Sequence, residues 1–155
     1  MASIRPLMVD MTSVDPPRIV GGCRIVILPK ITDVRGNLSF VEGGRHIPFV
    51  IRRAYWLYDV PGGAWRGGHA YHKLEEFIIA ASGSFDVVVD DGSERQVVQL
   101  NRSYLGLYVP SMVWRQIENV SSNSVALILA SLPYSEEDYL REYETFARLR
   151  REGCK

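Results

Sequence analysis

Cysteine is scarce in this sequence and neither sign of charge is in excess, and both facts exclude classes of protein. Its two cysteines, Cys23 and Cys154, do not have the spacing of a zinc or redox motif. Lysine plus arginine equals aspartate plus glutamate, at 18 residues each. We therefore expect no nucleic-acid partner, although a local basic pocket for a small anion stays possible.

Long apolar runs are also absent. No segment approaches the roughly 20 apolar residues that span a membrane, so we expect no membrane partner. Arg5, Asp10 and Asp15 interrupt the N-terminal stretch, which therefore does not have the apolar run of a signal peptide. Together with the low cysteine content, this predicts a protein of the reducing cytoplasm.

The chain does contain a series of short segments with β-type composition, separated by glycine, proline and aspartate. A spacing of about 8–12 residues between such segments is typical of a β-sandwich or barrel. The predicted strands are Arg24–Leu28, Leu38–Glu42, Arg53–Val60, Phe77–Ala81, Phe85–Asp90, Arg95–Leu100, Gly106–Val109, Val113–Asn119 and Val125–Ser131.

The 155 residues are enough for one domain with a sizeable core. We expect residues 1–22 to form an N-terminal arm and residues 23–155 to form the domain. The pattern changes to a helical period near residue 135. Ser135 is a good N-cap and Gly153 a stop signal, so one C-terminal helix of about four turns is predicted from there.

Two motifs within the β-rich region resemble those of the cupins. The first consists of Gly63, His69, Tyr71, Glu76 and Gly83, with Tyr71 where the second histidine usually stands. The second consists of the residues Gly106, Pro110, Trp114 and Asn119, with Trp114 in the histidine position. The predicted fold class is therefore all-β: a cupin, a small jelly-roll β-barrel, with one C-terminal α-helix.

The departures from these motifs argue against a metal. A metal-binding cupin uses imidazoles and a carboxylate, and only His69 and Glu76 are ordinary ligands here. Tyr71 would have to ionise, and Trp114 has only a donor. We expect no metal and no cofactor.

Strand geometry separates the histidines of the central segment. Side chains alternate between faces, so His69 and Tyr71 share one face of a regular strand while His72 points to the other. His46 is predicted to be a loop residue.

From about Ile31 to Phe146 the chain resembles the sugar 3,4-ketoisomerases that act on dTDP-4-keto-6-deoxyglucose, a WxcM-like branch of the cupins. The block Arg66–Ala70 is the most specific part of the resemblance. The other matching segments are Asp33–Gly36, Ile47–Phe49, Arg53–Asp59, Leu74–Glu75, Ser82–Ser84, Asp90–Gly92, Gly106–Pro110, Val113–Trp114 and Leu129–Ser131, with Tyr134, Asp138, Tyr139 and Arg141.

The resemblance implies a homodimer of small barrels that exchange N-terminal strands, and a dTDP-linked keto sugar bound in the barrel mouth. It implies an isomerase of deoxysugar biosynthesis, including that of the lipopolysaccharide O-antigen. The reaction moves the keto group from C4 to C3. A base removes the C3 proton, an enediol forms, protons move between O3 and O4, and C4 is reprotonated.

The resemblance also implies the catalytic residues. His69 matches the first catalytic histidine, whereas Tyr71 stands where the family usually has a second histidine as the base. An unperturbed tyrosine has a pKa of about 10 and is a poor base at neutral pH, unless a neighbouring cation lowers that value. Glu76 stands where glutamine is common and could supply a replacement base. The predicted catalytic residues are thus His69, Tyr71 and Glu76.

Further residues are predicted to bind the substrate. Arg66 is a better candidate than Arg35 for binding the diphosphate, because a guanidinium binds phosphate with two hydrogen bonds. Aromatic residues could contact the sugar or stack on the thymine. The predicted substrate-binding set is Arg35, Tyr55, Tyr58, Arg66, Tyr108 and Trp114.

Alternatives to the isomerase stay open at this point. The substitution at Tyr71 also fits a cupin that binds a nucleotide sugar without isomerase activity. A metal-dependent cupin enzyme is the more distant alternative.

Overall fold

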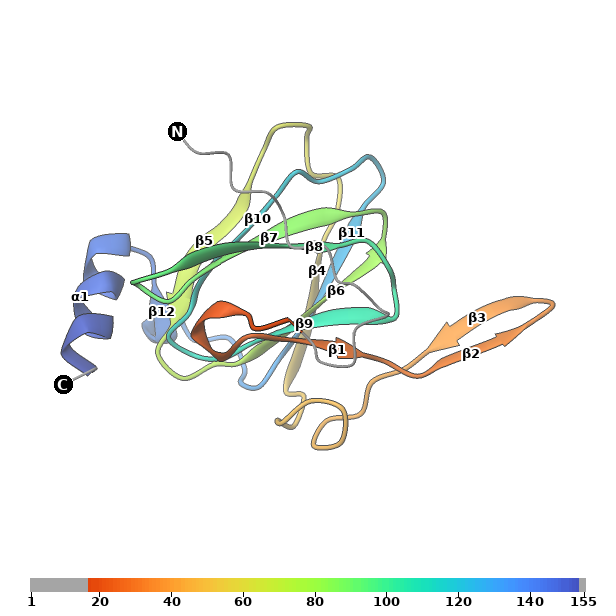
Figure 1. Ribbon diagram of the computed structural model, residues 1–155, viewed down its shortest axis with the longest axis horizontal. Coiled ribbons are helices and arrows are strands. Elements are labelled where there is room, and N and C mark those ends of the chain that lie inside the picture. The colour runs from red at the N-terminus through yellow and green to blue at the C-terminus, as the bar shows by residue number, and fades with distance from the viewer. Residues whose placement is uncertain (1–16, 154–155) are drawn as a thin grey trace.

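The computed structural model in Figure 1 describes residues 17–153, so Cys154 lies outside the described part of the chain. Most of this part consists of short strands, as the spacing of the β-type segments predicted. The strands are β1 Arg24–Ile27, β2 Lys30–Asp33, β3 Gly36–Ser39, β4 Arg53–Leu57, β5 Arg66–Tyr71, β6 Glu76–Ser82, β7 Phe85–Asp90, β8 Arg95–Leu100, β9 Leu105–Val109, β10 Trp114–Glu118, β11 Val125–Ala130 and β12 Tyr139–Leu140. The helical segments are the 3₁₀ turns η1 Val20–Gly22 and η2 Glu136–Asp138 and the helix α1 Tyr143–Gly153.

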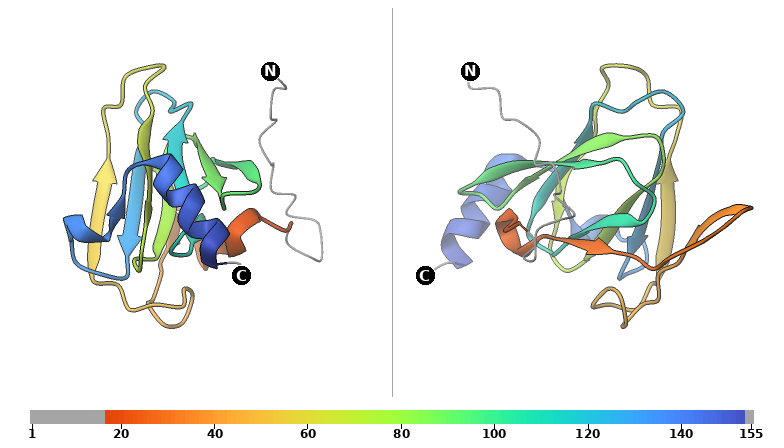
Figure 2. Two further views of the ribbon diagram at one scale, coloured as in Figure 1. Left: turned by 90° about the vertical axis from the view of Figure 1, so that its left-hand side faces the viewer. Right: turned by 45° about the vertical axis from the view of Figure 1, so that its right-hand side comes forward.

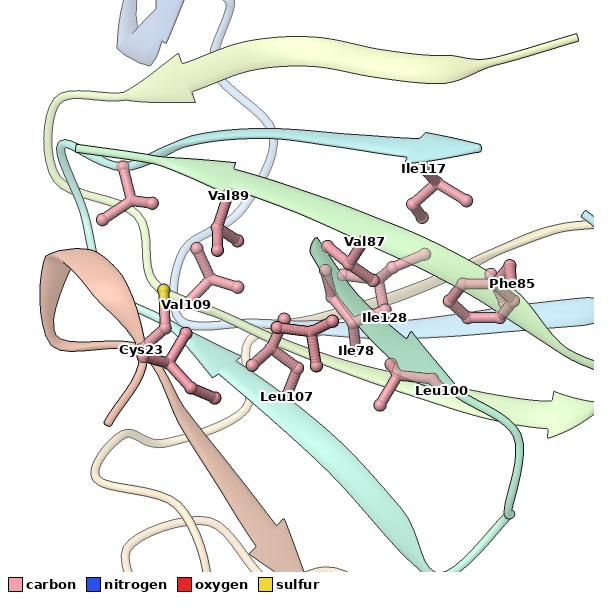
Figure 3. Close-up of a cluster of buried hydrophobic side chains, with 14 of the residues drawn as sticks. Cys23, Ile78, Phe85, Val87, Val89, Leu100, Leu107, Val109, Ile117 and Ile128 are labelled. Carbon is pink, nitrogen blue, oxygen red and sulfur yellow. The ribbon is translucent and has the colours of Figure 1, made fainter. Parts of the chain in front are cut away.

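Two antiparallel sheets face each other across the core. One has the order β1-β9-β6-β11-β4 and the other has the order β12-β5-β10-β7-β8. Side chains from both sheets point inward between them, among them Ile78, Val87 and Leu107 (Figure 3). The predicted cupin barrel is confirmed.

The hairpin β2–β3 forms a separate two-stranded sheet that projects from the barrel (Figure 1). Its turn lies at Val34 and Arg35. Ile31 and Leu38 are directly opposite each other across the hairpin and are 58% and 56% exposed. A two-stranded hairpin with an exposed apolar face is marginally stable by itself in water. The described residues leave this apolar pair largely uncovered.

The helix α1 covers the other end of the molecule (Figures 1 and 2). It begins at Tyr143, not near residue 135 as predicted, because the segment before it has sheet geometry. Tyr139 and Leu140 pair with Tyr71 and Ala70 of β5, which extends the sheet by one short strand. Ser135 precedes only a three-residue turn and makes no side-chain cap.

The end of the predicted N-terminal arm contacts the barrel, because Ile19 and Val20 are buried in the main core. The domain boundary at Cys23 stays a prediction. Within residues 17–153, no helix has the length and apolar character needed to cross a bilayer.

Candidate functional site

A cavity of about 490 Å³ opens between the two sheets, above the apolar core. Its volume falls within the range of about 300–1,000 Å³ that is usual for small-molecule sites. The cavity is lined by Tyr55, Leu57, Trp65, Arg66, Gly67, His69, Ile78, Arg115, Ile117, Ile128, Tyr139 and Arg141.

A buried ion pair forms part of its wall. Arg115 on β10 donates from Nε to Glu76 Oε2 at 2.6 Å and from Nη2 to Glu76 Oε1 at 2.7 Å. The two side chains are 7% and 1% exposed. Because Glu76 lies on β6, the pair joins the two sheets. A fully bonded pair of this kind holds both groups in one orientation.

Arg115 also contacts the three other polar side chains around it. Its Nη2 lies 3.1 Å from the Tyr55 hydroxyl and 3.4 Å from the Tyr71 hydroxyl. Its Nη1 lies 3.3 Å from Nδ1 of His69. Tyr55 in turn donates its hydroxyl to Glu76. One guanidinium thus orients two tyrosines, a histidine and a carboxylate.

His69 lies on β5 directly opposite Arg115 on β10, next to a break in the strand register. Its side chain lines the cavity and the residue is only 8% exposed. Nε2 is buried and has no hydrogen-bond partner. Burial, followed by the positive charges of Arg115 and Arg141, lowers the pKa of His69 to about 2. The imidazole is therefore neutral at physiological pH.

Tyr71 is next to His69 on the same face, as the strand alternation predicted. The two rings are 4.9 Å apart in an edge-to-face arrangement, and both contact the Tyr139 ring. Burial raises the pKa of Tyr71 above its ordinary value even though Arg115 opposes the change. Burial also raises the pKa of Tyr55. Both hydroxyls therefore stay protonated near neutral pH.

The structure brings together five of the nine predicted site residues. His69, Tyr55 and Arg66 line the cavity. Tyr71 and Glu76 are in contact with Arg115 but are not among the lining residues.

The other predicted residues lie elsewhere. Trp114 was predicted to contact the sugar, but it packs against Tyr143 and Phe146 of α1. Tyr108 lies against Phe49 and donates to Glu75, because the inward positions of β9 belong to its neighbours Leu107 and Val109.

Tyr58 and Arg35 are also outside the cavity. Tyr58 follows β4 and is exposed, since Tyr55 and Leu57 occupy the inward positions. Arg35 is at the turn of the projecting hairpin, where it forms an ion pair with Asp33. Neither residue lines the cavity of its own barrel.

Sequence reasoning missed Arg115, Trp65, Tyr139 and Arg141. A signal for Arg115 was present, since strand alternation places it on the same face as Ile117, while Trp114 points the other way. Tyr139 and Arg141 were assigned to a helix, which hid their place beside β5. Nothing in the local pattern of Trp65 pointed to the cavity, where its ring lies close to the backbone of Gly68.

The predicted absence of a metal stays a prediction. In the described residues no three histidine, cysteine, aspartate or glutamate side chains gather as a ligand group. The cationic Arg115 lies in contact with both His69 and Glu76, which makes this position unfavourable for a second cation.

Comparisons with known proteins agree on one family. The family model described as FdtA: WxcM-like, C-terminal matches residues 21–151. The TDP-4-oxo-6-deoxy-alpha-D-glucose-3,4-oxoisomerase of Aneurinibacillus thermoaerophilus is 39% identical over 125 residues, which cover 81% of this chain and 90% of that protein.

Solved structures give the same result. A 3,4-ketoisomerase from Helicobacter canadensis has a TM-score of 0.81 and 35% identity, over 84% of this chain and 98% of that one. The sugar 3,4-ketoisomerase QdtA from Thermoanaerobacterium thermosaccharolyticum, in complex with TDP, has a TM-score of 0.85 and 30% identity, over 87% and 98% of the two chains.

Proposed function

Because the chain belongs to the FdtA, WxcM-like family, we propose that it is a 3,4-ketoisomerase. Its substrate is a dTDP-linked 4-keto-6-deoxyhexose, and the reaction moves the keto group between C4 and C3 in deoxysugar biosynthesis. The oxoisomerase at 39% identity supports the reaction and the substrate class.

The observation that carries the proposal is the polar wall of the cavity. His69 and Arg115 present N–H groups to one cavity, above a floor of Ile78, Ile117 and Ile128. Such donors stabilise the negative charge that develops on an oxygen as an enediolate forms. Arg66 and Arg141 line the same cavity and supply positive charge for the diphosphate.

The reaction is an internal redox change that needs no external oxidant. The C3 hydrogen leaves as a proton, O4 gains a proton, O3 loses one, and C4 is protonated. Arg115 and His69 are placed to hold the oxygen that becomes negative.

We assign the carbon proton to the Tyr55–Glu76 pair. Tyr55 lines the cavity and donates its hydroxyl to Glu76. As the Tyr55 oxygen accepts the C3 proton, the hydroxyl proton passes to Glu76, so that the transfer is balanced. Tyr71 supports the site by contacting the His69 ring and Arg115.

The test is an NMR assay of the purified protein in D₂O with dTDP-4-keto-6-deoxyglucose. The expected result is loss of the C3 proton signal and appearance of a 3-keto product. Tyr55→Phe and Glu76→Gln should then abolish the exchange at C3, while Tyr71→Phe should only slow it. Exchange that persists in Glu76→Gln would show that this carboxylate is not the final proton acceptor.

A binding protein without turnover is the second candidate, and the raised pKa of Tyr71 favours it. Among the described residues Tyr71, unlike Tyr55, donates to no carboxylate that could take its hydroxyl proton, so it cannot replace the family's second histidine as a base. In the same assay this candidate predicts broadened ligand signals with neither exchange nor product.

We further propose a homodimer in which the β2–β3 hairpins are exchanged. The exposed apolar pair Ile31 and Leu38 supports this assembly. So does a groove of about 730 Å³ along the base of the hairpin, lined in part by Leu28, Phe40 and Tyr104. In such a dimer, Arg35 at the hairpin turn reaches the cavity of the partner, where its charge meets the diphosphate.

The place of the reaction in the cell follows from the same proposal. A dTDP-sugar isomerase acts in the cytoplasm on a soluble nucleotide sugar. Its product is a precursor of deoxysugars such as those of the lipopolysaccharide O-antigen.

A further inference from the structure

The contact between Arg115 and His69 limits the chemistry of the imidazole. A guanidinium has five N–H donors and no acceptor. Its Nη1 lies 3.3 Å from Nδ1 of His69, with the N–H aimed at that nitrogen. In this arrangement Nδ1 must be the acceptor. A neutral imidazole has one acceptor and one donor nitrogen, so the hydrogen is on Nε2.

The donor nitrogen is the one without a partner. Nε2 is buried and forms no hydrogen bond within the described chain, on a side chain that lines the cavity. A buried polar atom without a partner is costly and rare in native structures. A ligand oxygen in the cavity would satisfy it.

We propose that Arg115, held by Glu76, fixes His69 as the Nε2–H tautomer, so that His69 meets the substrate as a hydrogen-bond donor and not as a base. The inference rests on the proposed ketoisomerase function and assigns roles within that site. Arg115 and Glu76 are positioning residues for His69, and the Nε2–H polarises the sugar carbonyl or holds the enediolate oxygen.

The surroundings of His69 keep it neutral. Arg115 faces it from β10, Tyr71 lies beside it on β5, and Tyr139 covers it from β12. Arg141 and Glu136 are the other charged groups that act on it, with opposite effects on its pKa. Burial and the two arginines outweigh the Gly67 backbone carbonyl and Glu136, which both favour the protonated ring, so a second proton on the ring is strongly disfavoured. A neutral imidazole can act as an electrophile in this way.

The test is a long-range ¹H–¹⁵N correlation spectrum of the ligand-free protein, which reports the protonation of each imidazole nitrogen. The chain has three histidines. The variants His46→Gln and His72→Gln each remove one set of signals, and the third set belongs to His69. The expected spectrum for His69 has a pyridine-type Nδ1 and a pyrrole-type Nε2, unchanged between about pH 5 and 8. A pyrrole-type Nδ1, or a titration in this range, would overturn the proposal.

Variants then show whether the tautomer of His69 depends on the hydrogen bond from Arg115 or only on nearby positive charge. Arg115→Met with Glu76→Gln removes the donor and avoids a buried unpaired carboxylate. The expected result is loss of the single-tautomer spectrum, with signals of both tautomers. Arg141→Gln removes a nearby cation that makes no hydrogen bond to His69, and the tautomer should not change. A pure Nε2–H spectrum in the double variant would contradict the role of Arg115.

These spectra need no substrate, so they are independent of the isomerase assay. Turnover with the opposite tautomer would disprove this inference and leave the proposed function intact. The expected tautomer without turnover would support this inference and disprove the proposed function.

Discussion

The ion pair between Arg115 and Glu76 joins the two sheets of the barrel at the cavity wall, with both carboxylate oxygens bonded to one guanidinium. Tyr55, Tyr71 and His69 all depend on this pair for their orientation, since each contacts Arg115. The site is therefore organised by a group whose partner, Glu76, does not line the cavity. This arrangement has consequences for both stability and catalysis.

Loss of one member of the pair should destabilise the protein more than loss of both. Arg115→Met leaves the buried Glu76 carboxylate with the Tyr55 hydroxyl but without its cation, and breaking a buried ion pair in this way typically costs about 3–5 kcal/mol. In the double variant Arg115→Met with Glu76→Met, both charges are replaced by apolar groups of similar length, and the cost should be much smaller. Urea unfolding at neutral pH measures both. Equal free energies of unfolding for the single and double variants would contradict this account.

The stability of the protein should fall in mild acid because of His69. Its pKa is about 2 when folded and near 6.5 when unfolded, so below about pH 6.5 the unfolded chain binds a proton that the folded chain does not. Stability is therefore complete above that pH, and is lost by at most about 1.4 kcal/mol per pH unit below it.

Urea unfolding of the wild type and of His69→Gln at about pH 7 and about pH 5 measures this effect. The variant should lose about 2 kcal/mol less over that interval. The carboxylates titrate alike in both proteins and cancel in the comparison. The same loss in both would mean that the folded His69 takes up a proton in this range.

Much of this architecture could be predicted from the sequence because it is local. The strands Phe85–Asp90 and Arg95–Leu100 match their predicted bounds, since two valine-containing segments joined by an Asp-Gly turn define a hairpin without long-range information. The shared face of His69 and Tyr71 follows from the alternation of side chains along a strand.

The errors come from contacts that depend on the whole fold. Tyr139 has a helical spacing to Tyr143, yet its backbone pairs with β5, and no local signal reports a distant open edge. Its position in a motif predicts Trp114 as a site residue, although it is the neighbouring Arg115 that points inward. For Arg35 and its hairpin, the proposed partner is a second chain, and the pattern of one sequence does not show how two chains would pack.

Replacement of His69 should abolish turnover while leaving the fold intact. His69→Gln removes the unpartnered donor from the cavity, and loss of such a group typically lowers kcat by about 10²–10⁴-fold. His72→Gln is the matched control, because His72 follows on the same chain segment but is exposed and outside the cavity. The NMR assay should show the large loss in the first variant alone. Comparable losses in both would mean that the whole segment, and not this imidazole, is what the reaction needs.

Arg66 should contribute to binding of the nucleotide more than to chemistry. It is exposed at the cavity and forms no ion pair within the described chain, so its guanidinium is available to a diphosphate. A charge-assisted hydrogen bond is worth about 1.5–3 kcal/mol, and Arg66→Gln should therefore raise the Kd for TDP by about 10–100-fold. Calorimetric titration measures the change, with Arg148→Gln on the exposed side of α1 as the control. An unchanged Kd would mean that the diphosphate does not bind at Arg66 but at another part of the cavity.

The exposed hairpin should determine the oligomeric state of the protein in solution. Ile31→Ser with Leu38→Ser removes the apolar pair that we expect to pack on a second copy, since each such side chain contributes about 1.5–3 kcal/mol when buried. Light scattering after gel filtration should give a dimer for the wild type and a monomer for the variant. Leu132→Ser, at an exposed leucine outside the hairpin, should leave the dimer unchanged.

Mixed dimers then decide whether the hairpin serves its own cavity or that of the partner. Arg35→Gln and His69→Gln should each be inactive as pure proteins, because every site lacks one of the two groups. If hairpins are exchanged, a heterodimer of the two has one site with both Arg35 and His69 intact, since these come from different chains. Unfolding and refolding the variants together should therefore restore activity in the NMR assay, toward a quarter of the wild-type value for random pairing of equal amounts. If Arg35 instead served its own barrel, each chain in the mixture would keep its own defect. Activity would then stay at the level of the separate variants, and the contribution of Arg35 to the partner's cavity would be disproved.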